Sequence, residues 1–151
     1  MTQMSPHDLQ CPQCGHTQEM TVWSSLNVTI DPDLKDRLYA GEINVFECDN
    51  CASKAHINAP LLYHDMTQQF CVQLYDIEML GDSDFLRQFN SDGSIAIVDI
   101  PEEFAKSDNY LIRPHIVFDM YEMVRYVKFR DSIAYHEDNE SPSYLDEENL
   151  Y

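Results

Sequence analysis

Glycine is scarce in this chain, with four residues among 151. A phosphate-binding loop needs closely spaced glycines, because its backbone must approach the phosphate. The sequence contains no such loop, no Gly-x-Ser-x-Gly nucleophile turn and no His-Glu-x-x-His motif. These absences exclude the nucleotide-binding and hydrolytic sites that short motifs mark, and we predict no catalytic residue.

Basic residues are also few: nine Lys and Arg stand against 27 Asp and Glu, which gives a net charge of −18. The densest basic group is Arg125, Lys128 and Arg130, which we expect to pair with Glu122 and Asp131. So acidic a surface repels nucleic-acid phosphates and anionic lipids. We therefore expect no direct nucleic-acid binding, and either a basic protein partner or a role for the charge in solubility alone.

No apolar run approaches the roughly 18 residues of a transmembrane helix. The segment Met1 to Gln10 has neither a positive start nor an apolar stretch, so we expect no signal peptide. Four of the five cysteines have metal-ligand spacing, which is typical of a reducing compartment. Together these features predict a cytoplasmic protein without a membrane interaction.

Two Cys-x-x-Cys pairs, Cys11 with Cys14 and Cys48 with Cys51, are the strongest chemical signal in the sequence. Four thiolates at this spacing form a tetrahedral site for a soft divalent metal, above all zinc. Because four cysteines close the site, we predict structural Zn²⁺ rather than a hydrolytic centre. His16 could replace one cysteine, but four sulfur ligands already suffice.

The 33 residues between the pairs exceed the roughly 15–20 of a simple zinc ribbon, so we expect an inserted element. Residues 21–30 alternate like a half-buried strand. Asp31 and Pro32 are typical of a helix N-cap and first turn, and Gly41 of a helix end. Residues 43–47 then form a second strand that leads into the second cysteine pair.

These motifs resemble the CpXC family over roughly residues 9–75, with a weaker match at 110–132. The residues that carry the resemblance are Cys11-Pro12-Gln13-Cys14-Gly15, Leu26-Asn27-Val28, Asp31-Pro32-Asp33-Leu34, Tyr39-Ala40-Gly41-Glu42-Ile43-Asn44, Phe46-Glu47-Cys48, Cys51 and Pro60-Leu61-Leu62-Tyr63-His64-Asp65. Here the second pair lacks the family's proline, and Asp49 takes its place. The resemblance implies a mostly bacterial protein that binds metal through four cysteines and has no established biochemical activity.

The second half of the chain completes an α+β fold. We predict strands at 69–75 and 94–100, and a strand at 110–118 that Pro114 restricts to a sheet edge. Short and long helices are expected at 82–89 and from Asp119 to Ile133, capped by Asp82 or Ser83 and by Asp119 respectively. The predicted architecture is therefore zinc-ribbon-like knuckles with an inserted strand-helix-strand, packed on a small antiparallel sheet with a C-terminal helix.

We predict one domain over residues 9–135. Residues 136–151 are polar and acidic, as in a disordered tail. Residues 148–151 match the start of an engineered protease-cleavage tag, so we exclude them from functional reasoning. The sequence does not indicate an oligomeric state.

Three other features have an ordinary explanation beside a functional one. His64 and Asp65 could form an acid/base pair, but neighbours in sequence rarely face each other, and Asp65 is better explained as a turn residue. Cys71 is expected to be buried rather than nucleophilic. The acidic run 99–103 lacks the spacing of a calcium loop and is expected to be solvated.

Two functions remain. The first is a non-enzymatic, zinc-stabilised interaction module that docks a basic partner, such as a nucleic-acid-handling protein. Residues 76–151, with 18 acidic and six basic side chains, would then dominate the encounter. The alternative is a thiol-based redox or metal sensor in which the two cysteine pairs form disulfides when the metal leaves.

Overall fold

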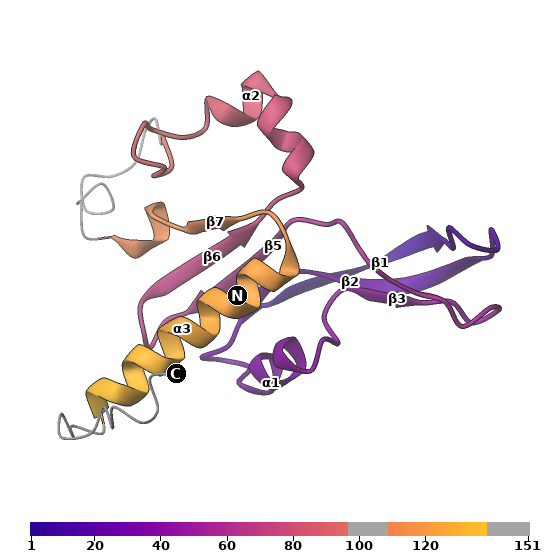
Figure 1. Ribbon diagram of the computed structural model, residues 1–151, viewed down its shortest axis with the longest axis horizontal. Coiled ribbons are helices and arrows are strands. Elements are labelled where there is room, and N and C mark those ends of the chain that lie inside the picture. The colour runs from indigo at the N-terminus through magenta and orange to yellow at the C-terminus, as the bar shows by residue number, and fades with distance from the viewer. Residues whose placement is uncertain (97–108, 139–151) are drawn as a thin grey trace, which may run out of the picture.

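The protein is described here by a computed structural model of residues 1–96 and 109–138 (Figure 1). The elements in chain order are β1 Gln3–Gln10, β2 Thr17–Asn27, α1 Asp33–Tyr39, β3 Val45–Glu47, β4 Lys54–His56, β5 Leu61–Asp65, β6 Phe70–Leu74, the 3-10 helix η1 Ile77–Gly81, α2 Ser83–Leu86, the 3-10 helix η2 Tyr110–Ile112, β7 His115–Val117 and α3 Met120–Asp138. The α+β class is confirmed.

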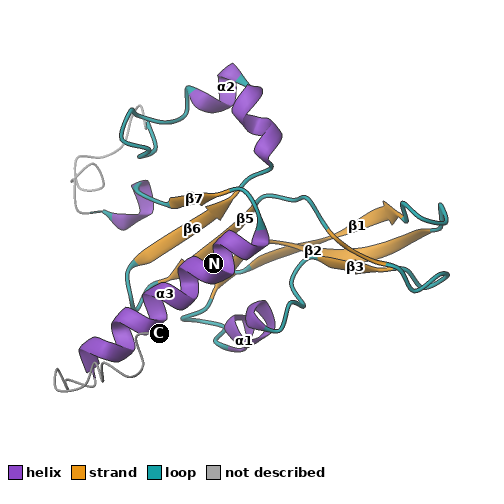
Figure 2. Ribbon diagram, in the orientation of Figure 1, coloured by secondary structure: helices purple, strands orange, loops and turns teal. Residues whose placement is uncertain are grey.

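The main sheet has five strands in the order β1-β2-β5-β6-β7, and β3 and β4 form a separate hairpin. The pairs β1–β2 and β5–β6 are antiparallel, whereas β2–β5 and β6–β7 are parallel. The predicted antiparallel sheet is therefore wrong: the sheet is mixed, because α1 and the β3–β4 hairpin intervene between β2 and β5 and let the chain re-enter in the same direction. Helix α3 lies along one face of this sheet (Figure 2) and contacts β6 and β7.

The core lies between α3 and this face of the sheet. Tyr63 and Val72 from adjacent strands and Met123 and Val127 from α3 are all fully buried. Burying a side chain of this size stabilises a fold by about 1.5–3 kcal/mol. Alternate residues of β5 point into this core, so a strand of only five residues is fixed in register.

Two of the three predicted helix caps are confirmed. Asp82 accepts hydrogen bonds from the backbone N–H groups of Asp84 and Phe85, and Asp119 accepts one from Glu122. The predicted Asp31 cap is wrong. Its carboxylate instead accepts the hydroxyl of Thr2 at 2.6 Å, and α1 begins without a side-chain cap.

Several boundaries differ from those predicted. Strands β1 and β5 were not expected, and only residues 115–117 of the predicted edge strand are extended, although β7 does form a sheet edge after Pro114. Of the strand predicted at 94–100, Ile95 forms a single bridge and residues 97–100 lie outside the described residues, as do the acidic run 99–103 and residues 139–151 of the predicted tail.

At both ends the described fold extends past the predicted domain limits of 9 and 135. Strand β1 pairs with β2 from Gln3 onward, and α3 continues through Asp138. Residues 136–138, assigned to the tail, are therefore helical. Within the described residues, no helix is both long and apolar enough to cross a membrane.

The predicted ion pairs on α3 are also wrong. Lys128 and Arg130 lie over the rings of Tyr39 and Phe70, at 5.5 and 4.4 Å from their centroids. Asp131 pairs with α1 instead, and Glu122 accepts the backbone N–H of Phe118. Cation–π contacts hold these basic groups against the body of the protein and take the place of surface ion pairs.

Asp131 joins three parts of the fold. Its carboxylate accepts hydrogen bonds from Lys35 Nζ at 2.9 Å and Tyr39 Oη at 2.5 Å on α1, and from Gln68 Nε2 at 2.7 Å in the β5–β6 turn. Burial raises the pKa of Asp131, but the bonds from Lys35, Tyr39 and Gln68 outweigh burial and hold the pKa below its ordinary value. Asp131 is therefore charged at neutral pH and ties α3 to α1.

Replacing Asp131 by Ala should lower the free energy of unfolding at pH 7 by about 1–3 kcal/mol, because three donors lose a charged acceptor. Tyr39→Phe removes one of these bonds and should cost about 1 kcal/mol. Urea denaturation of both variants with zinc present measures these differences. A loss for Asp131→Ala no larger than that for Tyr39→Phe would contradict a network centred on Asp131.

Candidate metal centre

Both Cys-x-x-Cys pairs lie in hairpin turns. Cys11 and Cys14 are in the turn between β1 and β2, and Cys48 and Cys51 are in the turn between β3 and β4. The two hairpins run side by side and end together at one end of the molecule (Figure 1). Residues separated by 33 positions in the chain thus meet at one point.

The two turns have the same backbone structure. In the first, Cys11 N–H donates to His16 O at 2.8 Å and Gly15 N–H donates to Cys11 O at 2.9 Å. In the second, Ala52 N–H donates to Cys48 O, again at 2.9 Å. The fifth residue of each turn has positive φ, 77° at Gly15 and 62° at Ala52. Each turn thereby directs its two sulfurs to the same side.

Two side-chain amides connect the hairpins. Gln18 on β2 donates to Glu47 O and accepts from Asp49 N–H, both at 2.9 Å. Asn44 accepts from Trp23 N–H at 2.8 Å and donates to Trp23 O at 2.9 Å. Each amide uses a donor and an acceptor, as a backbone peptide group does in a sheet. These bonds fix the second cysteine pair against the first.

The four sulfurs form a compact group. Cys11 Sγ lies 3.7 Å from Cys51 Sγ, and Cys14 Sγ lies 3.6 Å from Cys48 Sγ. All four sulfurs are within 4.8 Å of one another, and none is in a disulfide. A tetrahedron of Zn–S bonds of about 2.3 Å has edges of about 3.8 Å. The spacing of the sulfurs therefore fits one tetrahedral metal ion.

The surroundings of the sulfurs are unequal. Cys11 and Cys48 are buried, while Cys14 and Cys51 are exposed. Ser53 Oγ lies 3.2 Å from Cys11 Sγ, and this hydrogen bond lowers the pKa of Cys11 to about 6. Burial raises the pKa of Cys48 to about 11. A metal ion bound here would stabilise all four thiolates, including the one that burial disfavours.

The other residues that the sequence singled out lie apart from this group, which in the described part of the chain contains no histidine. His16 contributes only its backbone carbonyl, which accepts the hydrogen bond from Cys11 N–H in the first turn. His64 contacts Tyr110 Oη at 2.8 Å, while Asp65 caps the following turn at Gln68 N–H and lies 3.7 Å from Lys35 Nζ. The structure therefore does not form the acid/base pair.

Cys71 is buried as predicted, with 4% of its surface exposed. Burial raises the pKa of Cys71 to about 11. Burial therefore disfavours the thiolate form, which is the nucleophile.

Sequence reasoning missed Ser53, Gln18 and Asn44. Ser53 carries a weak signal, since a hydroxyl two residues after the last cysteine can reach a sulfur. Gln18 carries none, because its partner Glu47 lies more than twenty residues away in the chain. Asn44 belongs to the family resemblance, but nothing in the sequence indicates its bonds to Trp23. Such long-range bonds depend on how the hairpins pack.

The geometry defines a class of protein in which two adjoining hairpin turns bring four cysteines close enough together to hold a metal ion. Comparison with protein-family models matches residues 9–131 to the CpXC protein family, and the chain belongs to that family. Searches of curated proteins and of solved structures gave no match. Family membership and the cysteine group together support metal binding.

The shared turn geometry predicts opposite effects of two substitutions. Ala52→Gly should stabilise the protein by about 1 kcal/mol, because glycine adopts positive φ without the steric cost of a Cβ. Gly15→Ala should destabilise it by a similar amount of about 1 kcal/mol, from backbone strain, since the added Cβ would meet no atom closer than 3.7 Å.

Urea denaturation with excess zinc measures both changes, and the double variant should return close to the parent value. Changes of the same sign in the two single variants would contradict the equivalence of the turns.

Proposed function

We propose that Cys11, Cys14, Cys48 and Cys51 hold one structural zinc ion, and that the two hairpins form a zinc-ribbon-like unit around it. The observation that carries this proposal is the pair of sulfur contacts between the turns, at 3.6 and 3.7 Å. Each contact joins the first hairpin to the second. A metal ion at their centre would therefore cross-link segments that are distant in the chain.

A structural role fits this donor set better than a catalytic one. Four thiolates fill all four positions around zinc, so neither water nor substrate has a place to bind. Single iron also accepts four tetrahedral thiolates. We choose zinc because Zn²⁺ is not redox-active and so keeps a single charge state.

Metal analysis of the purified protein should find one zinc per chain and no stoichiometric iron. Cys48→Ser should yield an insoluble or molten protein, because structural zinc contributes about 10–16 kcal/mol of apparent binding free energy in small domains. Replacing Cys71 by Ser serves as the matched control, since this cysteine lies outside the group. That variant should keep its zinc.

A protein that unfolds cooperatively without stoichiometric metal would contradict this proposal. So would a Cys48→Ser variant with unchanged stability. Equal metal loss in the Cys48→Ser and Cys71→Ser variants would also contradict it, because only one of these cysteines belongs to the proposed site.

We further propose that the protein acts by binding a basic partner protein. Its charge of −18 supports this. Among the described residues, five basic side chains form ion pairs: Lys35, Arg37, Lys54, Arg87 and Arg113. The excess of acidic over basic side chains favours encounter with a cationic surface.

The tyrosines in the acidic half of the chain have different surroundings. Tyr126 stacks on His115 with 3.7 Å between ring centroids, and Tyr110 contacts His64. Tyr121, in contrast, is 65% exposed and sits in the first turn of α3. Of these three tyrosines, Tyr121 is therefore the one best placed to anchor a partner.

The sensor alternative has one observation in its favour: Cys14 and Cys51 are exposed, so an oxidant can reach half of the site. Treatment with mild peroxide distinguishes the two functions. A structural site keeps its zinc until the protein unfolds, whereas a sensor releases zinc reversibly as disulfides form.

The charge proposal is tested by reversing the charge of three acidic residues in each of two variants. Asp99, Glu102 and Glu103, which lie outside the described residues, are changed together to Lys. The control triple variant changes Asp8, Glu19 and Asp33, which are exposed in the first half of the chain. Partners captured from the native host at low salt should be basic, and only the first variant should lose most of this binding.

Binding should also weaken as salt rises to about 150 mM, where the Debye length is about 8 Å. The parent protein should show no affinity for bare DNA or RNA under these conditions. Acidic or neutral partners, or equal losses in both triple variants, would show that the charge does not direct recognition.

A further inference from the structure

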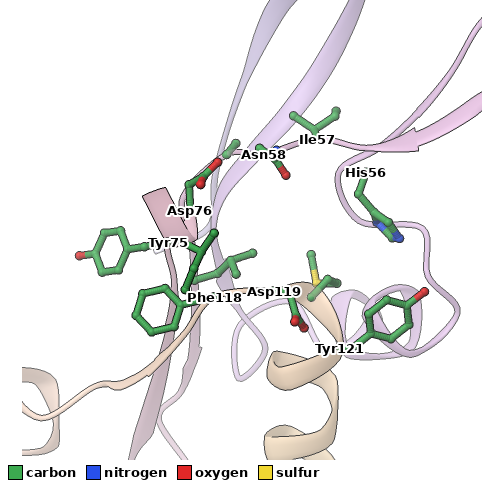
Figure 3. A pocket seen from close by; sticks show the side chains of 12 residues that line it. His56, Ile57, Asn58, Tyr75, Asp76, Phe118, Asp119 and Tyr121 are labelled. Atoms are coloured by element: carbon green, nitrogen blue, oxygen red, sulfur yellow. The ribbon is translucent and has the colours of Figure 1, made fainter. Parts of the chain in front are cut away.

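A cavity of about 190 Å³ lies where three segments meet: the connection from β4 to β5, the end of β6 and the start of α3. Figure 3 shows His56 and Tyr121 on one side of this cavity and Asp76 and Phe118 on the other. The lining is mainly apolar and includes the buried side chain of Leu74. This cavity lies apart from the cysteine group.

A second hollow of about 420 Å³ adjoins the first. It lies between β4 and the helices α1 and α3, and it shares His56, Met120 and Tyr121 with the first cavity. The rings of His56 and Tyr121 meet edge to face, with centroids 6.1 Å apart. The two hollows therefore lie side by side with these three residues between them, and we call the pair the β4–α3 groove.

The charge at one end of the groove is negative. Asp76 and Asp119 both line the first cavity. Each uses Oδ1 to cap a helix, accepting the backbone N–H of Glu78 and of Glu122 respectively, both bonds being 2.9 Å or shorter. Each carboxylate therefore has a second oxygen that can receive a cationic group. Among the groove residues described, Lys54 at the far end is the one basic side chain.

Strand β4 gives the groove a strand edge that is unpaired among the described residues. In the described part of the chain, β4 has a hydrogen-bonded neighbour on one side only, which is β3. Half of its backbone N–H and C=O groups are thus available to an added strand, as in peptide recognition by β-augmentation. An extended segment is the form of ligand that a strand edge beside an apolar groove accepts.

We propose that the β4–α3 groove binds an extended segment of the partner protein in which a large apolar side chain enters the cavity and a Lys or Arg lies at Asp76 and Asp119. This inference rests on the proposed function, since it names the surface that recognises the basic partner. Tyr121 closes over the apolar side chain as an exposed aromatic anchor. Charge complementarity selects a basic segment over an acidic one.

The test begins with a phage-displayed library of random peptides about twelve residues long, selected on the zinc-loaded protein. An extended segment of this length can span the groove. The enriched sequences are then made with a fluorescent label, and their Kd values are measured by fluorescence anisotropy. Enriched peptides should combine a large apolar residue with a nearby Lys or Arg.

Four variants locate the binding site. Tyr121→Ala should raise the Kd about tenfold or more, because it removes an aromatic anchor. Phe129→Ala is its control, since Phe129 is a similarly exposed aromatic residue of the same helix, 57% against 65%, and does not line the groove. This control should change the Kd less than about twofold.

The double variant Asp76→Asn/Asp119→Asn removes two charges while asparagine keeps both caps. It should raise the Kd about tenfold and flatten the dependence of binding on salt. Asp84→Asn removes an exposed charge outside the groove and should leave the Kd unchanged. Thermal unfolding of every variant checks that its fold is intact.

Basic peptides that bind with equal affinity to the parent and to Tyr121→Ala would overturn the groove and leave the basic-partner proposal standing. Enrichment of acidic or neutral peptides, or of none, would overturn both. A dimer in sedimentation that Tyr121→Ala disrupts would also overturn the peptide proposal, because the occupant would then be a second copy of this chain.

Discussion

The contact between the two hairpins is the constraint on which the rest of the structure depends. An isolated hairpin is marginally stable, and the second hairpin has strands of only three residues. Their association is fixed by the amides of Gln18 and Asn44 and by a small apolar cluster of Cys11, Phe46 and Cys48. This cluster is too small to hold two hairpins by burial, so a metal ion among the four sulfurs would supply the cross-link that the core does not.

The hairpins also determine where the proposed binding surface lies. Strand β4 follows the second cysteine pair directly, and the chain then passes through residues 57–60 into the central strand β5. One wall of the groove is therefore continuous with the metal centre, whereas the other belongs to α3. A metal ion among the cysteines would add one constraint on the first wall and none on the second. The four-cysteine group and the groove both involve the β3–β4 hairpin, although they share no side chain.

Features set by local chemistry could be predicted from the sequence. The cysteine spacing identified the four sulfurs that meet, and Asp82 and Asp119 cap the helices that follow them. Other predictions were wrong because contacts between distant segments determine those features. Asp31 has the sequence context of a cap, yet its carboxylate accepts a hydrogen bond from the hydroxyl of Thr2. Strand β1 is exposed along most of its length, so it lacks the apolar alternation that reveals a strand. The parallel pairing of β2 with β5 joins segments with a helix and a hairpin between them, which no local pattern encodes.

In the structure we propose, one metal ion joins the two hairpins through four sulfur atoms. X-ray absorption at the zinc K edge of the purified protein tests this most directly, because the method reports the type, number and distance of the atoms around the metal. We expect four sulfur neighbours at about 2.3 Å and no nitrogen or oxygen ligand. A shell that contains oxygen or nitrogen, or fewer than four sulfurs, would contradict the proposed structure.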